Sequence, residues 1–368
     1  MDSQKPAVIV TGSSGLIGYA VCEALAEDGF FVAGFDRPGV PHPPPAALNI
    51  PCDVTSDQSV SDALTRVREE AGQRVASVIH LAAYYDFSGE PSPLYEKVTI
   101  HGTERLLRLL RDFQVGQFVF SSTMLIHAPC EPGQHIDEDW PLQPMWDYPK
   151  SKFDTEQLIL ANRGDMPAVL LRIAGVYTDQ CESIPLAHQM QRIYEQRLTA
   201  KVFPGDISTG QSFVHLDDLL GALRQVVARR ADLPAEAPIL IGEPEPLSYD
   251  ELQRTFAWLI HHDPDWDTTQ IPKAVAKAGA WVQDTIPGIE EPFIKPWMID
   301  LADDHYALDI TRARKLLGWE PKRTLRETLP RMAEALEADP AKWYRDNKLE
   351  GAPPMTAEPA RAPGRRPT

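Results

Sequence analysis

Two residues of the chain, Tyr148 and Lys152, have the types and the spacing that could move a proton. In a helix, residues four positions apart lie on one face, so the lysine ammonium can lie beside the tyrosine hydroxyl. A nearby positive charge favours the phenolate and lowers the phenol pKa. Lowering that pKa from about 10 to about 7 takes roughly 4 kcal/mol of preferential stabilisation of the phenolate. The pair is therefore a candidate general base with its activating cation.

The same spacing occurs again at Tyr344 and Lys348, so context must separate the two pairs. Tyr148 follows a predicted strand that ends in Ser121-Ser122-Thr123, and Pro149 is typical of the first turn of a helix. Tyr344 lies beyond the predicted strands, and we interpret it as part of an exposed amphipathic helix end. The candidate catalytic residues are Thr123, which can hydrogen-bond the reacting oxygen, Tyr148 and Lys152.

Three glycines indicate where a phosphate-bearing cofactor would bind. Gly12, Gly15 and Gly18 follow a short apolar run that predicts a strand, and they open a predicted helix. Glycines there let the backbone turn sharply and approach a pyrophosphate, while the helix N-terminus attracts the anion. The next predicted strand ends at Asp36, whose carboxylate can bind an adenosine ribose and repels a 2′-phosphate. This pattern favours NAD over NADP, although Arg37 could pair with a 2′-phosphate.

Composition bounds the kind of partner. The chain has 368 residues, 43% of them hydrophobic, and a formal net charge of -17. A negative chain is poorly suited to bind nucleic acid or an anionic membrane, so we expect a small-molecule substrate and no nucleic-acid partner. The 4 cysteines are scattered without the spacing of a disulfide framework or a zinc site. No stretch has the length of a signal peptide or a membrane span, and we expect a cytoplasmic protein.

Several other polar residues are interpreted as structural. His80 and His215 lie at predicted strand ends, where hydrogen-bonded core histidines are the simpler interpretation. Residues 137–139 form an acidic triplet that we expect to be an exposed loop. Residues 261–263 contain two histidines and an aspartate, but no register brings them together, so we predict a solvated turn and no metal site.

Apolar runs alternate with helical patterns from residue 8 to residue 173, which predicts an α/β fold. We expect a Rossmann-type doubly wound parallel sheet, to which the segment 213–216 returns after an insertion. Beyond Pro244 the alternation stops, and helices with irregular connections predict a smaller, mainly helical C-terminal substrate lobe. The predicted domains are residues 1–178 and 210–243 for the dinucleotide-binding part, residues 179–209 and 244–345 for the lobe, and residues 346–368 for a disordered tail.

Taken together, these motifs resemble the extended short-chain dehydrogenase/reductases of the NAD-dependent epimerase/dehydratase family. The matching segments span residues 7 to about 330 in the family's order: 11–18, 53–54, 80–83, 121–123, 148–152, 171–172, 213–218 and 316–321. The resemblance implies that Asp53 and Val54 flank the adenine, that 81–83 lie at the central ribose and phosphates, and that Ser121 lines the nicotinamide. The implied NAD-binding residues are Gly12, Gly15, Leu16, Ile17, Gly18, Asp36, Arg37, Asp53, Val54, Leu81, Ala82, Ala83, Ser121, Tyr148 and Lys152.

The chain departs from the family pattern at several positions. Thr99 stands where the family usually has an asparagine that anchors a helix behind the catalytic groups. Met124 and Leu125 replace the Asp-Glu pair of sugar dehydratases, which disfavours dehydration. Segments 211–212 and 182–183 lack the arginine and asparagine that sugar-nucleotide epimerases usually present there.

The resemblance implies an NAD-dependent oxidoreductase or epimerase acting on a secondary alcohol or ketone, of sugar or sugar-nucleotide type, by hydride transfer. Whether the ketone is released or reduced again on its other face is left open. One alternative is an apolar alcohol of hydroxysteroid type, since residues 271–281 with Pro292, Ile294 and 296–298 resemble an apolar lid as much as a packed helix. The other is a non-catalytic dinucleotide-sensing protein. Helices near 94–110 and 146–160 resemble the family's four-helix dimer interface, so we expect a homodimer.

Overall fold

A parallel β-sheet forms the centre of the computed structural model, which describes residues 5–86, 91–278 and 296–351. The strand order is β11-β7-β6-β4-β1-β2-β3, with β5 beside β4, and every pairing is parallel. This confirms the predicted Rossmann-type α/β fold. The strands are β1 (Ala7–Thr11), β2 (Phe31–Asp36), β3 (Leu48–Pro51), β4 (Arg74–His80), β5 (Gln114–Val115), β6 (Phe118–Thr123), β7 (Ala168–Ile173) and β11 (Glu236–Ile241).

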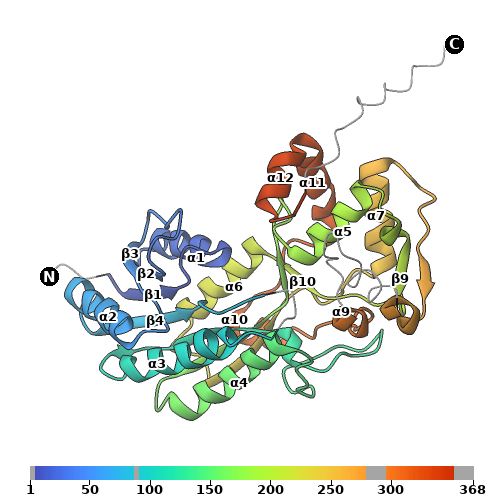
Figure 1. Cartoon of the computed structure of the whole chain (residues 1–368). Coiled ribbons are helices and arrows are strands. Elements are labelled where there is room, and N and C mark those ends of the chain that lie inside the picture. The colour runs from blue at the N-terminus through green and yellow to red at the C-terminus, as the bar shows by residue number, and fades with distance from the viewer. Residues whose placement is uncertain (1–4, 87–90, 279–295, 352–368) are drawn as a thin grey trace.

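Helices pack on both faces of the sheet, which buries the near-continuous apolar runs of the strands. One core lies between the sheet and the helices α1 (Leu16–Glu27), α6 (Leu216–Ala228) and α10 (Thr311–Leu317). The other core lies against α2 (Asp57–Ala71), α3 (His101–Leu110) and α4 (Asp147–Asn162). Figure 1 shows this layered part on the left.

The sheet reverses its direction of growth between β1 and β4, which are hydrogen-bonded neighbours although they are far apart in sequence. In such sheets, ligands bind in the crevice at the carboxyl ends of the strands where the order reverses. The glycine segment that follows β1 and residues 81–83 that follow β4 therefore lie at the predicted cofactor edge.

A third hydrophobic core lies within the C-terminal lobe, on the right in Figure 1. Its helices are α5 (Ile184–Tyr194), α7 (Tyr249–His261), α11 (Leu325–Ala338) and α12 (Pro340–Asp346). The short helix α9 (Pro296–Asp300) also lies on this side of the molecule. The predicted domain limits stay a prediction, but the region beyond Pro244 is mainly helical, as expected.

One strand assignment was wrong. The segment predicted to return to the main sheet forms β10 (Phe213–His215), which pairs instead with β8 (Gly175–Tyr177) in a separate two-stranded sheet. A Cβ atom on Gly175 would lie 2.6 Å from the Phe213 ring, so this close pairing depends on glycine. The strand that returns to the main sheet is β11. A second small sheet pairs β9 (Val202–Pro204) with β12 (Thr269–Ile271).

The interpretation of Tyr344 as an exposed residue was also wrong. The α12 helix packs on the third core, which leaves Tyr344 only 2% exposed, and its hydroxyl donates to Glu195 Oε1 at 2.8 Å. Asn347 and Leu349 are buried as well, so the ordered chain continues past residue 346, where the tail was predicted to begin. Residues 352–368 lie outside the described residues, and so do Trp281, Pro292 and Ile294 of the proposed lid.

Asp137 and Asp139 of the acidic triplet are exposed, as predicted, but Glu138 between them is not. Glu138 is buried, accepts the Leu240 N–H at 2.9 Å and lies 3.3 Å from Arg312 Nε. A carboxylate can be buried there because the edge strand β11 and a guanidinium supply its partners.

None of the helices in the described ranges is both long and apolar enough to cross a membrane.

The expected homodimer can be tested through the helices that would form it. The outward residues of α3, α4 and the preceding π-helical turn η1 (Tyr95–Ile100) include Lys97, Glu104, Arg108 and Lys150, so this face is strongly charged. Salt screens exposed charge pairs. We predict that light scattering at micromolar concentration gives twice the 41.0 kDa mass of one chain, and that high salt shifts the protein toward monomer. A single-chain mass at low salt would contradict the prediction.

Candidate active site

The glycine segment forms a tight turn between β1 and α1. The Gly12 N–H donates to Phe35 O at 2.8 Å, and Gly12 has a φ of +70°, which only glycine adopts without strain. A Cβ atom on Gly18 would lie 2.1 Å from Gly12 O, so that glycine is needed for α1 to pack against the turn. At Gly15, the residue before α1, a Cβ atom would meet only Gly12 O, at 3.4 Å. The turn therefore leaves its Gly15 side open at the start of the helix.

Two polar groups fit this turn for a dinucleotide. Ser14 Oγ is buried without a hydrogen-bond partner, as expected of a group whose partner is a bound phosphate or hydroxyl. The carboxylate of Asp36 lies beside it, because its Oδ2 accepts the Ser14 N–H at 2.8 Å and its Oδ1 accepts the Arg37 N–H at 2.8 Å. Each oxygen keeps a lone pair for a ribose hydroxyl. Leu16 and Ile17 follow in the first turn of α1, whose N–H groups have no partner within the helix.

Asp53 and Val54 lie after β3, on the side of the sheet that carries Asp36. The Thr55 backbone and side chain both donate to Asp53 Oδ1 at 2.8 Å, and these bonds hold the pKa of Asp53 below its usual range. Val54 is buried against Gly102 of α3, where a Cβ atom would lie 3.1 Å from Val54 Cγ2. The loop that would flank an adenine is thus fixed by a helix and by its own turn.

His80 joins the ends of β1 and β4 to α3. It is fully buried, and burial lowers its pKa to about 3, so the ring is neutral. Thr103 Oγ1 donates to Thr99 O at 2.5 Å, so it can only accept from His80 Nε2 at 2.9 Å. His80 Nδ1 then accepts from Thr11 Oγ1 at 2.7 Å. The expectation of a hydrogen-bonded structural histidine is met.

The same chain of hydrogen bonds positions residues 81–83. Thr11 Oγ1 accepts the Leu81 N–H at 3.2 Å and the Ala82 N–H at 3.1 Å, which draws the segment after β4 over the glycine turn. Ala82 N lies 3.0 Å from the position of a Cβ atom on Gly12. Ala83 follows and is half-buried. Residues 12 and 81–83, which are distant in sequence, therefore line one edge.

Tyr148, Thr123 and Lys152 meet at the end of β6, as their spacing predicted. The helix α4 begins at Asp147, one residue before the predicted start, and carries Tyr148 and Lys152 on one face. Lys152 Nζ lies 5.8 Å from the Tyr148 ring centroid and donates to Ser121 O at 2.7 Å. Ser121 Oγ donates to His80 O at 3.2 Å, which connects this group to the cofactor edge.

Burial determines the protonation of this group in the chain alone. Burial raises the pKa of Tyr148 to about 12, and a hydrogen bond with Thr123 opposes the rise only in part. Burial also lowers the pKa of Lys152 to about 7, against the carboxylate of Glu156. In the chain alone, the phenol is therefore neutral and the lysine only partly charged at neutral pH. Lowering the phenol pKa requires a further positive charge near the hydroxyl.

A buried ion pair lies behind Lys152. Glu156, one helical turn further along α4, accepts from Arg172 Nη2 at 2.9 Å and Nε at 3.2 Å, and both residues are buried. Arg172 also donates to Glu138 O at 2.8 Å. Sequence reasoning missed Glu156 as part of the site. Its position four residues after Lys152 was the available signal.

The residues that depart from the family pattern make defined contacts in the structure. Thr99 Oγ1 accepts the Tyr84 N–H at 3.0 Å, so a hydroxyl anchors the loop after β4. Met124 is buried directly after Thr123 and offers no acid or base there. Ser212 Oγ donates to Glu243 O at 2.7 Å, and Glu182 accepts from Thr178 Oγ1 at 2.8 Å.

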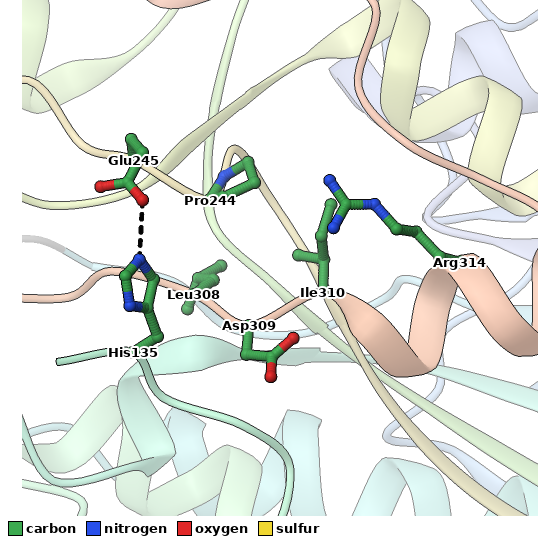
Figure 2. Close-up of a pocket in the computed structure, with 7 residues that line it drawn as sticks. All are labelled: His135, Pro244, Glu245, Leu308, Asp309, Ile310 and Arg314. Atoms are coloured by element: carbon green, nitrogen blue, oxygen red, sulfur yellow. Dashed lines mark hydrogen bonds and ion pairs between the residues drawn. The ribbon is translucent and has the colours of Figure 1, made fainter.

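A separate surface depression, of about 320 Å³, lies beside Pro244 and Leu308 and contains none of the predicted site residues. Figure 2 shows its charged groups, of which His135 Nε2 and Glu245 Oε1 pair at 2.7 Å. Asp309 Oδ1 accepts the Thr311 N–H at 2.8 Å. These charged groups already have hydrogen-bond partners within the chain. The depression is therefore not the candidate active site. Among the described residues, no group of His, Cys, Asp or Glu has the arrangement of a metal site.

Known proteins resemble this chain in sequence and in fold. Residues 8–242 match the model of the NAD dependent epimerase/dehydratase family. The chain is 27% identical to a UDP-glucuronate 4-epimerase of Thermodesulfobacterium geofontis, covering 88% of this chain and 94% of that one. It is 25% identical to a 3-beta-hydroxysteroid dehydrogenase of Mycolicibacterium neoaurum, covering 89% and 90%. The solved structure of MoeE5 in complex with UDP-glucose and NAD shares the fold, with a TM-score of 0.66 and 22% identity over 90% of this chain and 99% of that one.

The glycine turn yields a paired prediction. Gly18→Ala places a methyl group against the Gly12 carbonyl, so we expect a loss of about 3 kcal/mol or more in the free energy of unfolding. Gly15→Ala meets no such contact, so its free energy of unfolding should lie within about 1 kcal/mol of the wild-type value. Its affinity for NAD should fall at least about tenfold, because the methyl group occupies the open side of the turn. Urea unfolding and calorimetric titration measure the two effects. Equal stability of the two variants would contradict the assigned packing.

The buried Lys152 yields a prediction with a defined pH dependence. Its pKa is about 7 in the fold against 10.5 in an unfolded chain, so the unfolded state binds the proton more readily between these pH values. The resulting cost in stability is full below pH of about 7 and disappears as the pH rises toward about 10. Cofactor-free Lys152→Met should therefore be more stable than the wild type at pH 7, and the difference should shrink as the pH rises. A pH-independent difference in thermal unfolding would contradict the burial of a partly charged lysine.

Proposed function

Because this chain belongs to the NAD-dependent epimerase/dehydratase family, an enzyme family, we propose that it transfers hydride between NAD and the carbinol carbon of a secondary alcohol, with Tyr148 as the general base. The observation that carries the proposal is the meeting of Tyr148, Thr123 and Lys152 at the end of β6, beside the edge lined by the glycine turn. An alcohol whose oxygen lies between Tyr148 and Thr123 would present its carbon toward that edge.

The NAD site proposed here uses the residues that the fold brings to the reversal point of the sheet. The start of α1, with Gly12, Gly15, Leu16 and Ile17, holds the pyrophosphate, and Ser14 Oγ gains a partner there. Asp36 binds the adenosine ribose and favours NAD over NADP, although the exposed Arg37 leaves NADP binding open. The remaining residues proposed to contact the cofactor are Asp53, Val54, Leu81, Ala82, Ala83, Ser121 and Lys152.

NAD⁺ held along this edge would supply the hydride acceptor and a positive charge near the phenol. Tyr148 then takes the hydroxyl proton, and Thr123 hydrogen-bonds the oxygen as charge develops on it. Lys152 donates to Ser121 O, from where the ammonium can also reach ribose hydroxyls. A charged Lys152 and the nicotinamide together supply the positive potential that the buried phenol lacks in the chain alone.

Two outcomes share this chemistry. A ketone that leaves makes the enzyme a dehydrogenase, and a ketone that turns and is reduced on its other face makes it an epimerase. The relatives support both outcomes, since one is named a 4-epimerase and another a hydroxysteroid dehydrogenase. Dehydration is disfavoured because Met124 and Leu125 supply no acid or base. NAD(H) that copurifies tightly would favour the epimerase, and a readily exchanged cofactor the dehydrogenase.

A purely sensory role has less support, because the chain has both Tyr148 and Lys152 and they lie close together. The proposed substrate is a small molecule with a secondary alcohol or ketone, of sugar or sugar-nucleotide type or, as the alternative, an apolar alcohol. A cytoplasmic location is likewise part of the proposal.

Removing the Tyr148 hydroxyl tests the proposal. Tyr148→Phe keeps the ring and its packing, so NAD affinity should change less than about threefold, while the rate of hydride transfer should fall by about 100-fold or more. Tyr194→Phe is the matched control, because Tyr194 packs on the core of the lobe, away from β6, and should leave the rate unchanged. Tyr344 is unsuitable as that control, since its hydroxyl makes a hydrogen bond that stabilises the fold. A Tyr148→Phe rate within about tenfold of wild type would falsify the assigned general base.

A further inference from the structure

Aromatic side chains from separate segments form a continuous row through Tyr148. The Tyr85 ring, in the loop after β4, meets the Tyr148 ring edge-on at 4.8 Å between centroids. Trp146, the residue before α4, lies 5.4 Å from Tyr148 on the same basis. Trp297 of α9 lies 4.8 Å from Trp146. We call Tyr85, Tyr148, Trp146 and Trp297 the aromatic row.

The row is held in place by polar contacts of its neighbours. The Tyr84 N–H donates to Thr99 Oγ1 at 3.0 Å, and Tyr95 Oη donates to Asp86 O at 2.9 Å, so the residues on both sides of Tyr85 are anchored. Trp146 is the residue that precedes α4, and its ring packs against the rings of Tyr148 and Trp297. The row is thus a built surface with defined ring positions.

The row is partly exposed to solvent, and exposed apolar side chains lie beside it. The side chain of Tyr85 is 47% exposed, and Trp146 and Trp297 are half-buried. In the segment that leads to Trp146, Leu142 and Met145 are 41% and 46% exposed. Accessible aromatic and aliphatic side chains beside a reactive group are characteristic of sites for apolar ligands.

Among the described residues, the cations near the row already have partners. Lys152 donates to Ser121 O at 2.7 Å and is assigned to the cofactor ribose. On the α9 side, Lys277 pairs with Asp300 and Lys273 pairs with Asp303. A diphosphate would need cations that are not already neutralised by carboxylates. A neutral ligand needs none.

From these contacts we infer that the aromatic row binds the ring system of a neutral, flat, apolar secondary alcohol and presents its hydroxyl to Tyr148. The hydroxyl must lie within hydrogen-bond reach of Tyr148, so the rings extend from there across Trp146 and Trp297. The proposal names the substrate class of the site and rests on the proposed function. Trp146 and Trp297 would then set specificity by stacking, without a part in the chemistry.

Equilibrium dialysis of the NAD-loaded protein against a hydroxysteroid, a neutral four-ring secondary alcohol, tests the row. We expect saturable binding, and a loss of about tenfold in affinity for Trp146→Leu and for Trp297→Leu, since each removes one stacking surface. Trp258→Leu is the matched control: Trp258 is 52% exposed on α7, packs against His262, and should leave the affinity unchanged. UDP-glucose and cyclohexanol serve as the polar and the small comparison ligands, and both should bind at least about tenfold more weakly.

Absent binding of the hydroxysteroid, or binding that neither tryptophan variant weakens, overturns the proposal. Tyr148→Phe separates it from the proposed function. If the hydroxysteroid binds through the row but NADH formation does not depend on Tyr148, the proposed chemistry fails and the row stands. If UDP-glucose binds and is turned over through Tyr148 while the hydroxysteroid does not bind, the chemistry stands and the row is not the recognition surface.

Discussion

The geometry of the site depends on one buried imidazole. His80 accepts from Thr11 at one nitrogen and donates to Thr103 at the other, and this order is fixed because Thr103 has already given its proton to Thr99 O. Since burial lowers the His80 pKa to about 3, the ring stays neutral at neutral pH and the order is kept. The histidine thereby locks the end of β1, the end of β4 and the helix α3 together. Protonating Nδ1 would place an N–H opposite the Thr11 hydroxyl, which already accepts two backbone N–H groups and would lose the acceptor of its own proton.

Lys152 represents a different compromise. A lysine buried between Phe120, Tyr148 and Ser121 O is unfavourable for the fold, since loss of hydration disfavours its charged form. The Glu156 carboxylate limits this penalty and is itself neutralised by Arg172. The arrangement keeps an ammonium close to the phenol at a cost in stability, which is the usual relation between an active site and the fold that supports it.

The parts that could be predicted from sequence are those in which a local pattern determines the geometry. The glycine turn, the start of α4 and the strand ends at Asp36 and Thr123 were predicted because their residue types report backbone conformation directly. The pairing of β10 with β8, the burial of Glu138 and the burial of Tyr344 were not, because each depends on a partner more than about 30 positions away. Burial by distant segments also raises the pKa of Tyr148, an effect that the spacing of Lys152 in the sequence does not report.

The aromatic row belongs to this second group, and that has a consequence for substrate choice. Tyr148 and Lys152 are positioned by β6 and α4, which pack on the core of the Rossmann part, whereas Trp297 comes from α9, in the C-terminal region. Changes in that region can therefore alter the ring surface without moving the residues that transfer the proton. Two relatives of similar identity, 27% and 25%, have names that differ in both substrate and outcome. The substrate of this chain must accordingly be argued from Tyr85, Trp146 and Trp297 and not from the motifs that define its chemistry.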